Sequence, residues 1–188
     1  MQSITIIGAG YAGALAASRI ARRGAPVTLI DANAGLVERI RLHQVLAGDD
    51  IPAIPYRELF RNLPVDFVQA RVTGIDRRAK QVLTTDGPIA YDKLVYALGS
   101  VNATPEHTVS VGNPMLARQR LSEAKEVVIV GGGLTGIETA AELAERHPHL
   151  AITLMDRGTI GKGLSERARK HLHEWMTAHH VTLREHTE

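Results

Sequence analysis

Residues 3–13 read SITIIGAGYAG, a short apolar run that leads directly into a glycine-rich turn. The residues that follow, Ala14 to Arg23, are rich in Ala, Leu and Arg and predict a helix. A second apolar run, Val27 to Ile30, then ends on the acid Asp31. A buried strand, a glycine turn, a helix and a second strand closed by an acid are the parts of a dinucleotide-binding βαβ unit.

Each part of this unit has a physical task at a bound dinucleotide. Gly8 permits the tight turn, Gly10 lets the backbone approach a pyrophosphate, and Gly13 lets the helix pack closely against the strands. The free N–H groups of the first helical turn, around Tyr11 and Ala12, would face the phosphates together with the helix dipole. The acid that closes the second strand can accept hydrogen bonds from both ribose hydroxyls. Glycines that only shape a loop are the alternative, and the strand–helix–strand context disfavours it.

The same order of parts recurs between residues 126 and 156. An apolar strand, Glu126 to Val130, runs into GGGLTG at residues 131–136, and a helix follows to Arg146. Because an accidental match would have to occur twice, the repeat predicts a second dinucleotide site. A strand over residues 151–155 precedes the closing acid, and the expected contacts are Gly131, Gly133, Leu134, Thr135, Gly136 and Asp156.

The rest of the chain predicts an α/β fold with two Rossmann-like, three-layer units and a small antiparallel β-hairpin insertion. The hairpin is expected over residues 81–91, with the turn Asp86-Gly87-Pro88. The remaining predictions are an irregular or helical stretch at 36–47, a short helix at 56–63, strands at 65–72 and 93–98, a linker at 101–113, a polar helix at 116–125, an amphipathic helix at 165–180 and a strand from 181.

Composition excludes several classes of function. The net charge of +2 is too small to imply a nucleic-acid partner, and 4% aromatic residues provide no stacking platform for single strands. The absence of cysteine excludes a redox-active disulfide and a thiolate metal site. The late string His171-Leu172-His173-Glu174 is not HExxH, and side chains two apart lie on different helix faces, so no metal is expected. No signal peptide and no transmembrane segment are expected, and a cytoplasmic location fits.

At this point the chain resembles the two-dinucleotide flavoprotein reductases of the pyridine nucleotide-disulphide oxidoreductase superfamily. It is most similar to the type II NADH dehydrogenase kind. The resemblance covers almost the whole chain, and it is carried by GAGYAG at 8–13, RLHQ at 41–44 with Ala47-Gly48, DKLVYALGS at 92–100 and residues 131–143.

The resemblance implies FAD at the first turn and NAD(P)H at the second, in an FAD-binding domain at 1–112 and a partial NAD(P)H-binding domain at 113–188. Hydride would pass from the nicotinamide to the flavin and on to an acceptor such as a quinone. In such proteins an acid like Asp31 holds the adenosine ribose of FAD. Further implied FAD contacts are Val72 beside the adenine, Ala97 and Gly99 near the flavin, and Arg41 to Gln44 near the isoalloxazine.

Two acids of the second unit bear on the reaction. The resemblance implies that Glu138, expected in the first turn of the helix, faces the nicotinamide–flavin region and orients the cofactor or relays a proton. The alternative is an acid favoured there only by the helix dipole. Asp156 attracts ribose hydroxyls and repels a 2′-phosphate, which favours NADH, although Arg157 and Lys162 could meet a phosphate.

The chain departs from the family pattern in two ways. Without cysteine it cannot belong to the disulfide-reducing branches, which leaves quinones, dyes, other proteins or oxygen as acceptors. It is also short for such a reductase, and a fragment or truncated relative is expected. The second hypothesis is therefore a non-catalytic nucleotide-binding module or a remnant that acts through a partner chain. A homodimer, and a peripheral membrane location in full-length relatives, are left open.

Overall fold

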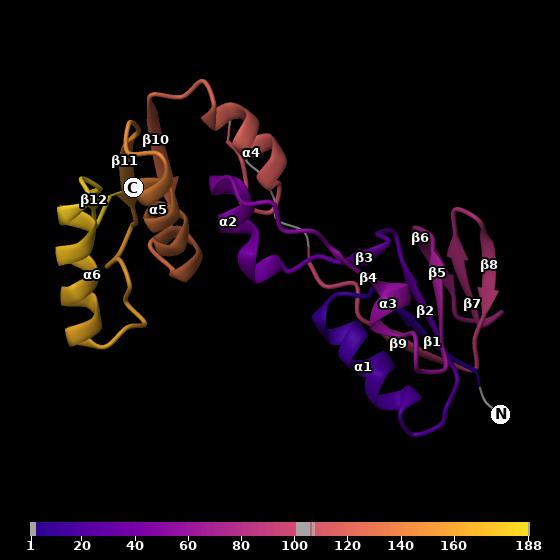
Figure 1. Ribbon diagram of the computed structural model, residues 1–188. Helices are drawn as coiled ribbons and strands as arrows, with labels where there is room; N and C mark the ends of the chain where they lie inside the picture. Colours follow the sequence, from indigo (N-terminus) through magenta and orange to yellow (C-terminus); the bar gives the residue numbers. More distant parts are fainter. Residues whose placement is uncertain (1–2, 101–105, 107, 188) are drawn as a thin grey trace. The chain divides into compact units, whose positions relative to one another are not determined.

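The computed structural model describes residues 3–100, 106 and 108–187 (Figure 1). The chain forms two compact units, Met1–Glu38 with Pro52–Val101 and Arg39–Ile51 with Asn102–Glu188. Residues 101–105 and 107 of the linker predicted at 101–113 lie outside the described residues. The predicted division at residue 112 stays a prediction.

The first unit is built on a four-stranded parallel sheet in the order β5-β2-β1-β9. Its repeat consists of β1 (Ile4–Ile7), α1 (Tyr11–Ala21) and β2 (Val27–Asp31), with β5 (Val65–Gln69) and β9 (Lys93–Tyr96) as flanking strands. Ile7 pairs with Ile30, so the glycine turn and the end of β2 meet at the carboxyl edge of the sheet. This is the edge at which open α/β sheets bind ligands.

Both faces of this sheet are covered, which makes three layers. On one face α1 packs over a core that includes the fully buried Ile6 and Leu29. On the other lies an antiparallel sheet of β6 (Val72–Asp76), β7 (Gln81–Thr84) and β8 (Gly87–Ala90) (Figure 1). Its Val82 is buried against Ile7 and Ile30. The predicted hairpin is confirmed as β7–β8, within a three-stranded sheet. Its predicted turn Asp86-Gly87-Pro88 is wrong: the turn is Thr85-Asp86, because Gly87 and Pro88 already pair with β7.

Several predicted boundaries in the first unit are wrong. The single strand predicted over 65–72 is two strands, because the chain leaves the parallel sheet after Gln69 and Val72 begins the antiparallel one. The helix predicted to 63 is α3 (Tyr56–Leu59), a single turn. A small antiparallel pair, β3 (Gly35–Leu36) with β4 (Ile54–Pro55), precedes it.

The second unit repeats the first in strand order. Its parallel sheet runs β10-β11-β12, just as β1-β2-β5 do, and the repeat predicted from the sequence is confirmed. A shared core contains Leu143, Leu154 and Met176, each at most 1% exposed. The elements are α4 (Pro114–Leu121), β10 (Glu126–Val130), α5 (Leu134–Arg146), β11 (Ala151–Met155), α6 (Glu166–Ala178) and β12 (Thr182–Arg184).

The segment 39–51 packs within the second unit, although it interrupts the first in sequence. It forms the 3₁₀ helix η1 (Arg39–Arg41) and α2 (Leu42–Ala47). Leu46 and Ala47 are buried in the same core as Leu143 of α5. The residues that the resemblance assigns to the flavin, Arg41 and Gln44, therefore lie in the unit that carries the second glycine turn.

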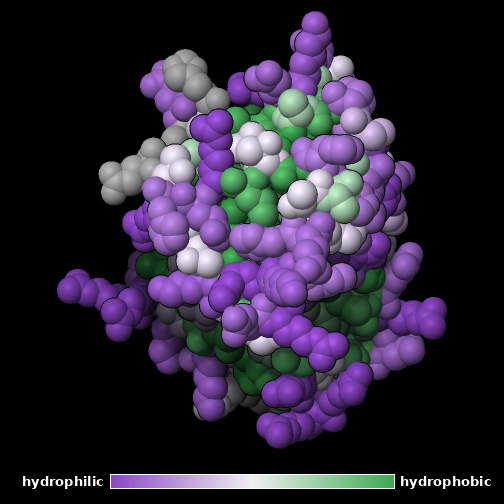
Figure 2. Space-filling model, turned by 90° about the vertical axis from the view of Figure 1, so that its left-hand side faces the viewer, coloured by the Kyte–Doolittle hydropathy of each residue, from purple (hydrophilic) through white to green (hydrophobic). Residues whose placement is uncertain are grey.

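Strand β10 of the second unit exposes two valines to solvent. Val128 and Val130 are 60% and 80% exposed, whereas Val127 and Ile129 pack against the core. Figure 2 views the molecule from the side on which Figure 1 draws α6, and there hydrophilic side chains dominate, with apolar areas between them.

Within the part of the chain that the structure describes, no helix is long and apolar enough to cross a membrane.

Candidate functional site

The first glycine turn is locked by backbone contacts that only glycine tolerates. Gly8 has a φ of +90°, in the left-handed region, and its N–H donates to the Ile30 carbonyl at 2.8 Å. A Cβ on Gly13 would collide with the Gly8 carbonyl oxygen. The start of α1 is therefore pressed against the turn, as the sequence predicts.

Gly10 faces open space at the start of the helix. Its backbone is extended, with φ −63° and ψ −170°, and the described residues place no atom within 4 Å of a Cβ built there. No side chain of the described chain caps α1, which begins at Tyr11. The first N–H groups of α1, including those of Tyr11 and Ala12, are thus left for an anion.

Asp31 ties the end of β2 to the glycine turn. Its Oδ2 accepts the Ala9 N–H at 2.7 Å, and its Oδ1 accepts the backbone and side-chain N–H groups of Asn33 at 2.8 and 3.0 Å. A carboxylate has about four acceptor sites, so at least one remains for a ribose hydroxyl. The ribose contact stays a prediction. The acid also has a structural role that was not predicted, because it ties the glycine turn to the end of β2.

The second turn repeats this arrangement. The N–H of Gly131 donates to the Met155 carbonyl at 2.8 Å, and the N–H of Gly132 donates to Asp156 Oδ2 at 2.6 Å. A Cβ on Gly136 would collide with the Gly131 carbonyl oxygen. Helix α5 begins after Gly133, which is extended and, like Gly10, has no described atom within 4 Å of a Cβ position.

A cavity of about 580 Å³ opens beside this second turn. Thr135 lies outside its lining, on α5, where its carbonyl accepts the Thr139 hydroxyl at 2.7 Å. The basic side chains of Arg157 and Lys162 line the cavity together with the carboxylate of Asp156. The acid that would bind a ribose and the bases that could meet a phosphate are therefore at the same cavity. The lining residues are Gly132, Gly133, Leu134, Asp156, Arg157, Gly158, Thr159, Gly161, Lys162, Gly163 and Leu164.

Asp156 gives the second unit a pH dependence. Hydrogen bonds from the Gly132 and Gly158 N–H groups hold the pKa of Asp156 below its ordinary value of about 3.9. The ionised Asp156 therefore stabilises the folded protein fully at pH values above the ordinary pKa. This stabilisation is lost as the pH falls through the lower pKa of the folded state. We expect the stability advantage of the native protein over Asp156→Asn to be constant above about pH 5 and to shrink in acid.

Urea denaturation followed by the fluorescence of Trp175, the only tryptophan, measures this difference. Asp50→Asn, at an exposed aspartate of the same unit, is the control and should leave the acid profile unchanged. An advantage over Asp156→Asn that is the same at pH 3 and pH 7 would contradict the prediction.

Glu138 lies in the second turn of α5, so the predicted first-turn position is wrong. The dipole effect falls off within the first turn, which removes the basis of the dipole alternative. Glu138 Oε2 lies 3.7 Å from His43 Nδ1 of α2, with the two side chains 49% and 12% exposed. The structure therefore gives this acid a specific partner. His43 lies within the stretch 41–44 that the resemblance places near the flavin, but its pairing with Glu138 was not predicted.

Further polar contacts hold α2 on α5. Gln44 accepts the Arg41 Nε–H at 2.8 Å and donates to Glu142 at 3.4 Å. At the other end of α2, Asp49 forms an ion pair with Arg146 at 2.6 Å. These contacts, with His43–Glu138, align the RLHQ string along the helix that follows the second glycine turn.

The other predicted FAD contacts lie in the first unit. Ala97 follows β9, donates to the Ile7 carbonyl at 2.8 Å and lies beside the first glycine turn. Gly99 has a φ of +69°, and Val72 begins β6. Tyr56, which the sequence analysis missed, donates its hydroxyl to the Ala9 carbonyl at 2.8 Å.

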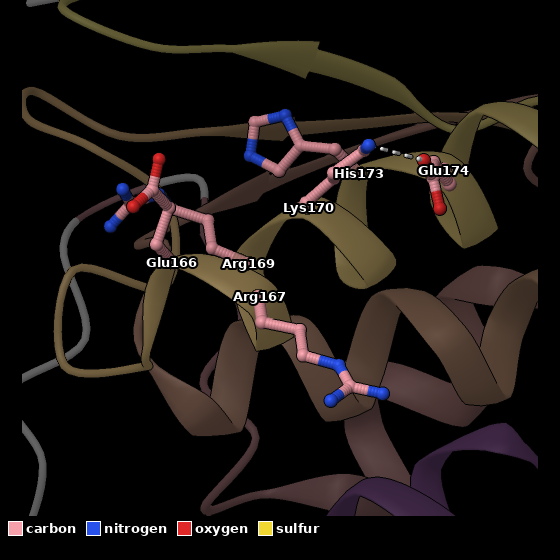
Figure 3. Close-up of a pocket in the computed structure, with 6 residues that line it drawn as sticks. All are labelled: Glu166, Arg167, Arg169, Lys170, His173 and Glu174. Atoms are coloured by element: carbon pink, nitrogen blue, oxygen red, sulfur yellow. Dashed lines mark ion pairs between the residues drawn. The ribbon is translucent and has the colours of Figure 1, made fainter.

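A second hollow, of about 760 Å³, lies along α6 and holds none of the predicted site residues (Figure 3). Its side chains carry both signs of charge and come from one helix. Lys170 lies 3.9 Å from Glu174, and His173 lies 3.7 Å from Glu185. The lining residues are Glu166, Arg167, Arg169, Lys170, His173 and Glu174.

A family model described as pyridine nucleotide-disulphide oxidoreductase matches residues 2–188. The chain belongs to this family. Among curated members, a type II NADH:quinone oxidoreductase of Staphylococcus aureus is 32% identical over 79% of this chain and 44% of its own length. The chain thus spans less than half the length of the curated relatives it matches.

Solved structures of other proteins share the fold. A ferredoxin reductase from Rhodopseudomonas palustris superposes with a TM-score of 0.82 at 21% identity, covering 100% of this chain and 51% of its own. An NDH2 from Plasmodium falciparum in complex with NADH gives 0.80 at 16% identity, covering 98% and 48%. At these identities the likeness shows the two-unit α/β fold alone.

Proposed function

We propose that this chain is an FAD-dependent oxidoreductase that passes a hydride from NADH to the flavin and on to a quinone-like acceptor. The observation that carries the proposal is the duplicated glycine turn. Each copy presents an uncapped helix start, an open Gly position and a carboxylate at the end of the second strand. Two cradles of this kind suit two dinucleotides.

The residues of the first unit fit FAD. The space beside Gly10 admits a diphosphate against the backbone, and Asp31 retains an acceptor site for a ribose hydroxyl. When bound, FAD supplies the chemistry of accepting a hydride and passing electrons on. We assign this binding to residues 1–112, of which 39–51 and 102–112 belong to the second unit.

The second unit fits NADH better than NADPH. The Asp156 carboxylate lies at the cavity and would repel a 2′-phosphate, and its depressed pKa keeps that charge at neutral pH. Arg157 and Lys162 line the same cavity and could bind a 2′-phosphate, so they reduce the preference for NADH over NADPH. We therefore propose a preference for NADH and not an exclusion of NADPH.

Glu138 and His43 are the proposed proton-handling pair. NADH, one proton and a quinone give NAD⁺ and a quinol, so one proton must reach the acceptor with each hydride. A carboxylate beside an imidazole can hold and release that proton, and the pair lies on the helix that follows the second glycine turn.

Replacing Glu138 with glutamine is expected to lower turnover about 100-fold, which is within the range for loss of a general acid or base. Glutamine keeps the size of the side chain but cannot carry the proton. Steady-state NADH oxidation with a soluble quinone measures the effect, and Glu145→Gln, at an exposed position of the same helix, is the control. Rates that match those of the control would leave Glu138 a structural role only.

The proposed acceptor is a quinone, and the proposed location is the cytoplasm. The quinone is suggested by the Staphylococcus aureus relative, whose name states NADH:quinone oxidoreductase. We propose a cytoplasmic protein, with peripheral attachment to the membrane in full-length relatives. Whether it forms a homodimer is a matter for a mass measurement in solution.

A non-catalytic nucleotide-binding module is the second candidate, because the chain spans only 44% of the Staphylococcus aureus relative. The absorbance of the purified protein separates the two. A yellow protein whose flavin band is bleached by NADH, and by NADPH only at higher concentration, supports the reductase. A colourless protein that gains no flavin on addition of FAD, but binds adenine nucleotides, supports the module.

A further inference from the structure

The peptide groups on both sides of Ala9, in the first glycine turn, are held. The Ala9 N–H donates to Asp31 Oδ2 at 2.7 Å, and the Ala9 carbonyl accepts the Tyr56 hydroxyl at 2.8 Å. The two partners come from different elements, the end of β2 and α3. Rotation of either peptide plane would break one of these bonds.

The orientation of the Ala9 carbonyl decides where the Gly10 N–H points. The described residues contain no cis peptide, so this bond is trans, and the carbonyl and the following N–H point in opposite directions. With the carbonyl turned toward Tyr56, the Gly10 N–H is directed away from the core. It lies beside the open space at Gly10 and the uncapped start of α1.

Tyr56 is suited to hold this carbonyl. Its side chain is 2% exposed and packs against Phe67, with ring centroids 4.7 Å apart. Burial, with a smaller contribution from the Asp31 charge, raises the pKa of Tyr56 to about 12. The hydroxyl therefore remains protonated and able to donate at any pH at which the protein would work.

The second unit makes the same clamp from different groups. Gly132, at the position that corresponds to Ala9, donates its N–H to Asp156 at 2.6 Å and accepts the Gly161 N–H on its carbonyl at 2.8 Å. One turn thus uses a tyrosine hydroxyl and the other a backbone amide. Because two unrelated donors bind the carbonyl at the same position of the two turns, we infer that a fixed carbonyl orientation is required in this turn.

We propose that Tyr56 is a positioning residue of the first dinucleotide site, which directs the Gly10 N–H toward the diphosphate by holding the Ala9 carbonyl. This inference rests on the proposed function, since it assumes that FAD binds at the first turn. It goes beyond it by assigning the orientation of the phosphate-binding backbone to one buried hydroxyl.

The test is the Tyr56→Phe variant of the whole chain, which removes only the hydroxyl. We expect about tenfold weaker FAD binding, the equivalent of one hydrogen bond of about 1.4 kcal/mol. Binding of NAD⁺ at the second turn should be unchanged, because Gly161 holds that turn. FAD fluorescence quenching and calorimetry with NAD⁺ provide the two affinities, at a temperature where circular dichroism shows both proteins folded.

Tyr91→Phe is the matched control, since Tyr91 packs on the opposite face of the first sheet. It should bind both cofactors as the native protein does. A Tyr56→Phe variant that is less stable but binds FAD with native affinity would overturn the inference and leave the proposed function intact. Failure of the native chain to bind FAD would instead contradict the proposed function, and the inference with it.

Discussion

Replacing Gly13 with alanine is expected to destabilise the first unit by at least about 2 kcal/mol, the scale of overpacking in a rigid site. The new Cβ would collide with the Gly8 carbonyl oxygen. Gly8 is held in place, because its N–H donates to the Ile30 carbonyl at 2.8 Å and the Ala97 backbone fills the space in which a Cβ on Gly8 would lie. The helix start would have to move off the sheet.

Urea denaturation followed by far-UV circular dichroism measures the loss. Gly10→Ala is the matched control, three residues earlier at the same helix start. Its φ of −63° suits any residue, and no described atom lies within 4 Å of the added Cβ, so near-native stability is expected. Equal denaturation midpoints for the Gly13 and Gly10 variants would show that the close approach at Gly13 does not constrain the fold.

The repeated βαβ units could be predicted because their signals are local. Apolar runs, glycines at fixed spacing and an acid at the end of the second strand all lie within 31 residues in the first copy. The same contacts recur in the structure, from the Gly8–Ile30 bond in one unit to the Gly131–Met155 bond in the other. Steric and hydrogen-bonding requirements between residues that are close in the sequence can be recognised from the sequence itself.

The elements that were predicted wrongly depend on distant partners. The apolar alternation through residues 65–72 does not reveal that the chain changes sheets after Gln69, because both halves alternate in the same way. Segment 39–51 follows β2 and β3 in sequence, yet Leu46 is buried against the core of α5. The local hydrophobic pattern does not predict which of the two cores a short amphipathic helix packs against.

Contacts between side chains that are far apart in the sequence could not be predicted either. Tyr56 lies 47 residues from Ala9, and His43 lies 95 residues from Glu138. Spacing along the chain does not predict either pair, because each depends on how α2 or α3 is packed. Only the resemblance places residues 41–44 and Glu138 in one region, near the flavin. The predicted Asp31 and Asp156 were accessible from the pattern, although their bonds to Ala9 and Gly132 were not.

Replacing Gly133 with valine is expected to weaken NADH binding at least about 100-fold while the flavin stays bound. A Cβ there projects into space that is open in the protein and that a diphosphate would occupy. The phosphates would lose two or more hydrogen bonds from the helix start, each worth about 1.5–3 kcal/mol when one partner is charged. The extended backbone of Gly133, at φ −78°, accepts valine without strain.

Gly10→Val is the reciprocal variant, and the two together assign one cofactor to each turn. It should lose FAD and keep NAD⁺ binding, because its backbone is extended in the same way and its Cβ position is equally open. Flavin content by absorbance and NAD⁺ affinity by calorimetry separate the two losses. A chain in which both variants lose the same cofactor would have a single working cradle, since two independent sites cannot respond alike. That result would refute the reductase and leave the duplicated turn as a feature of the fold.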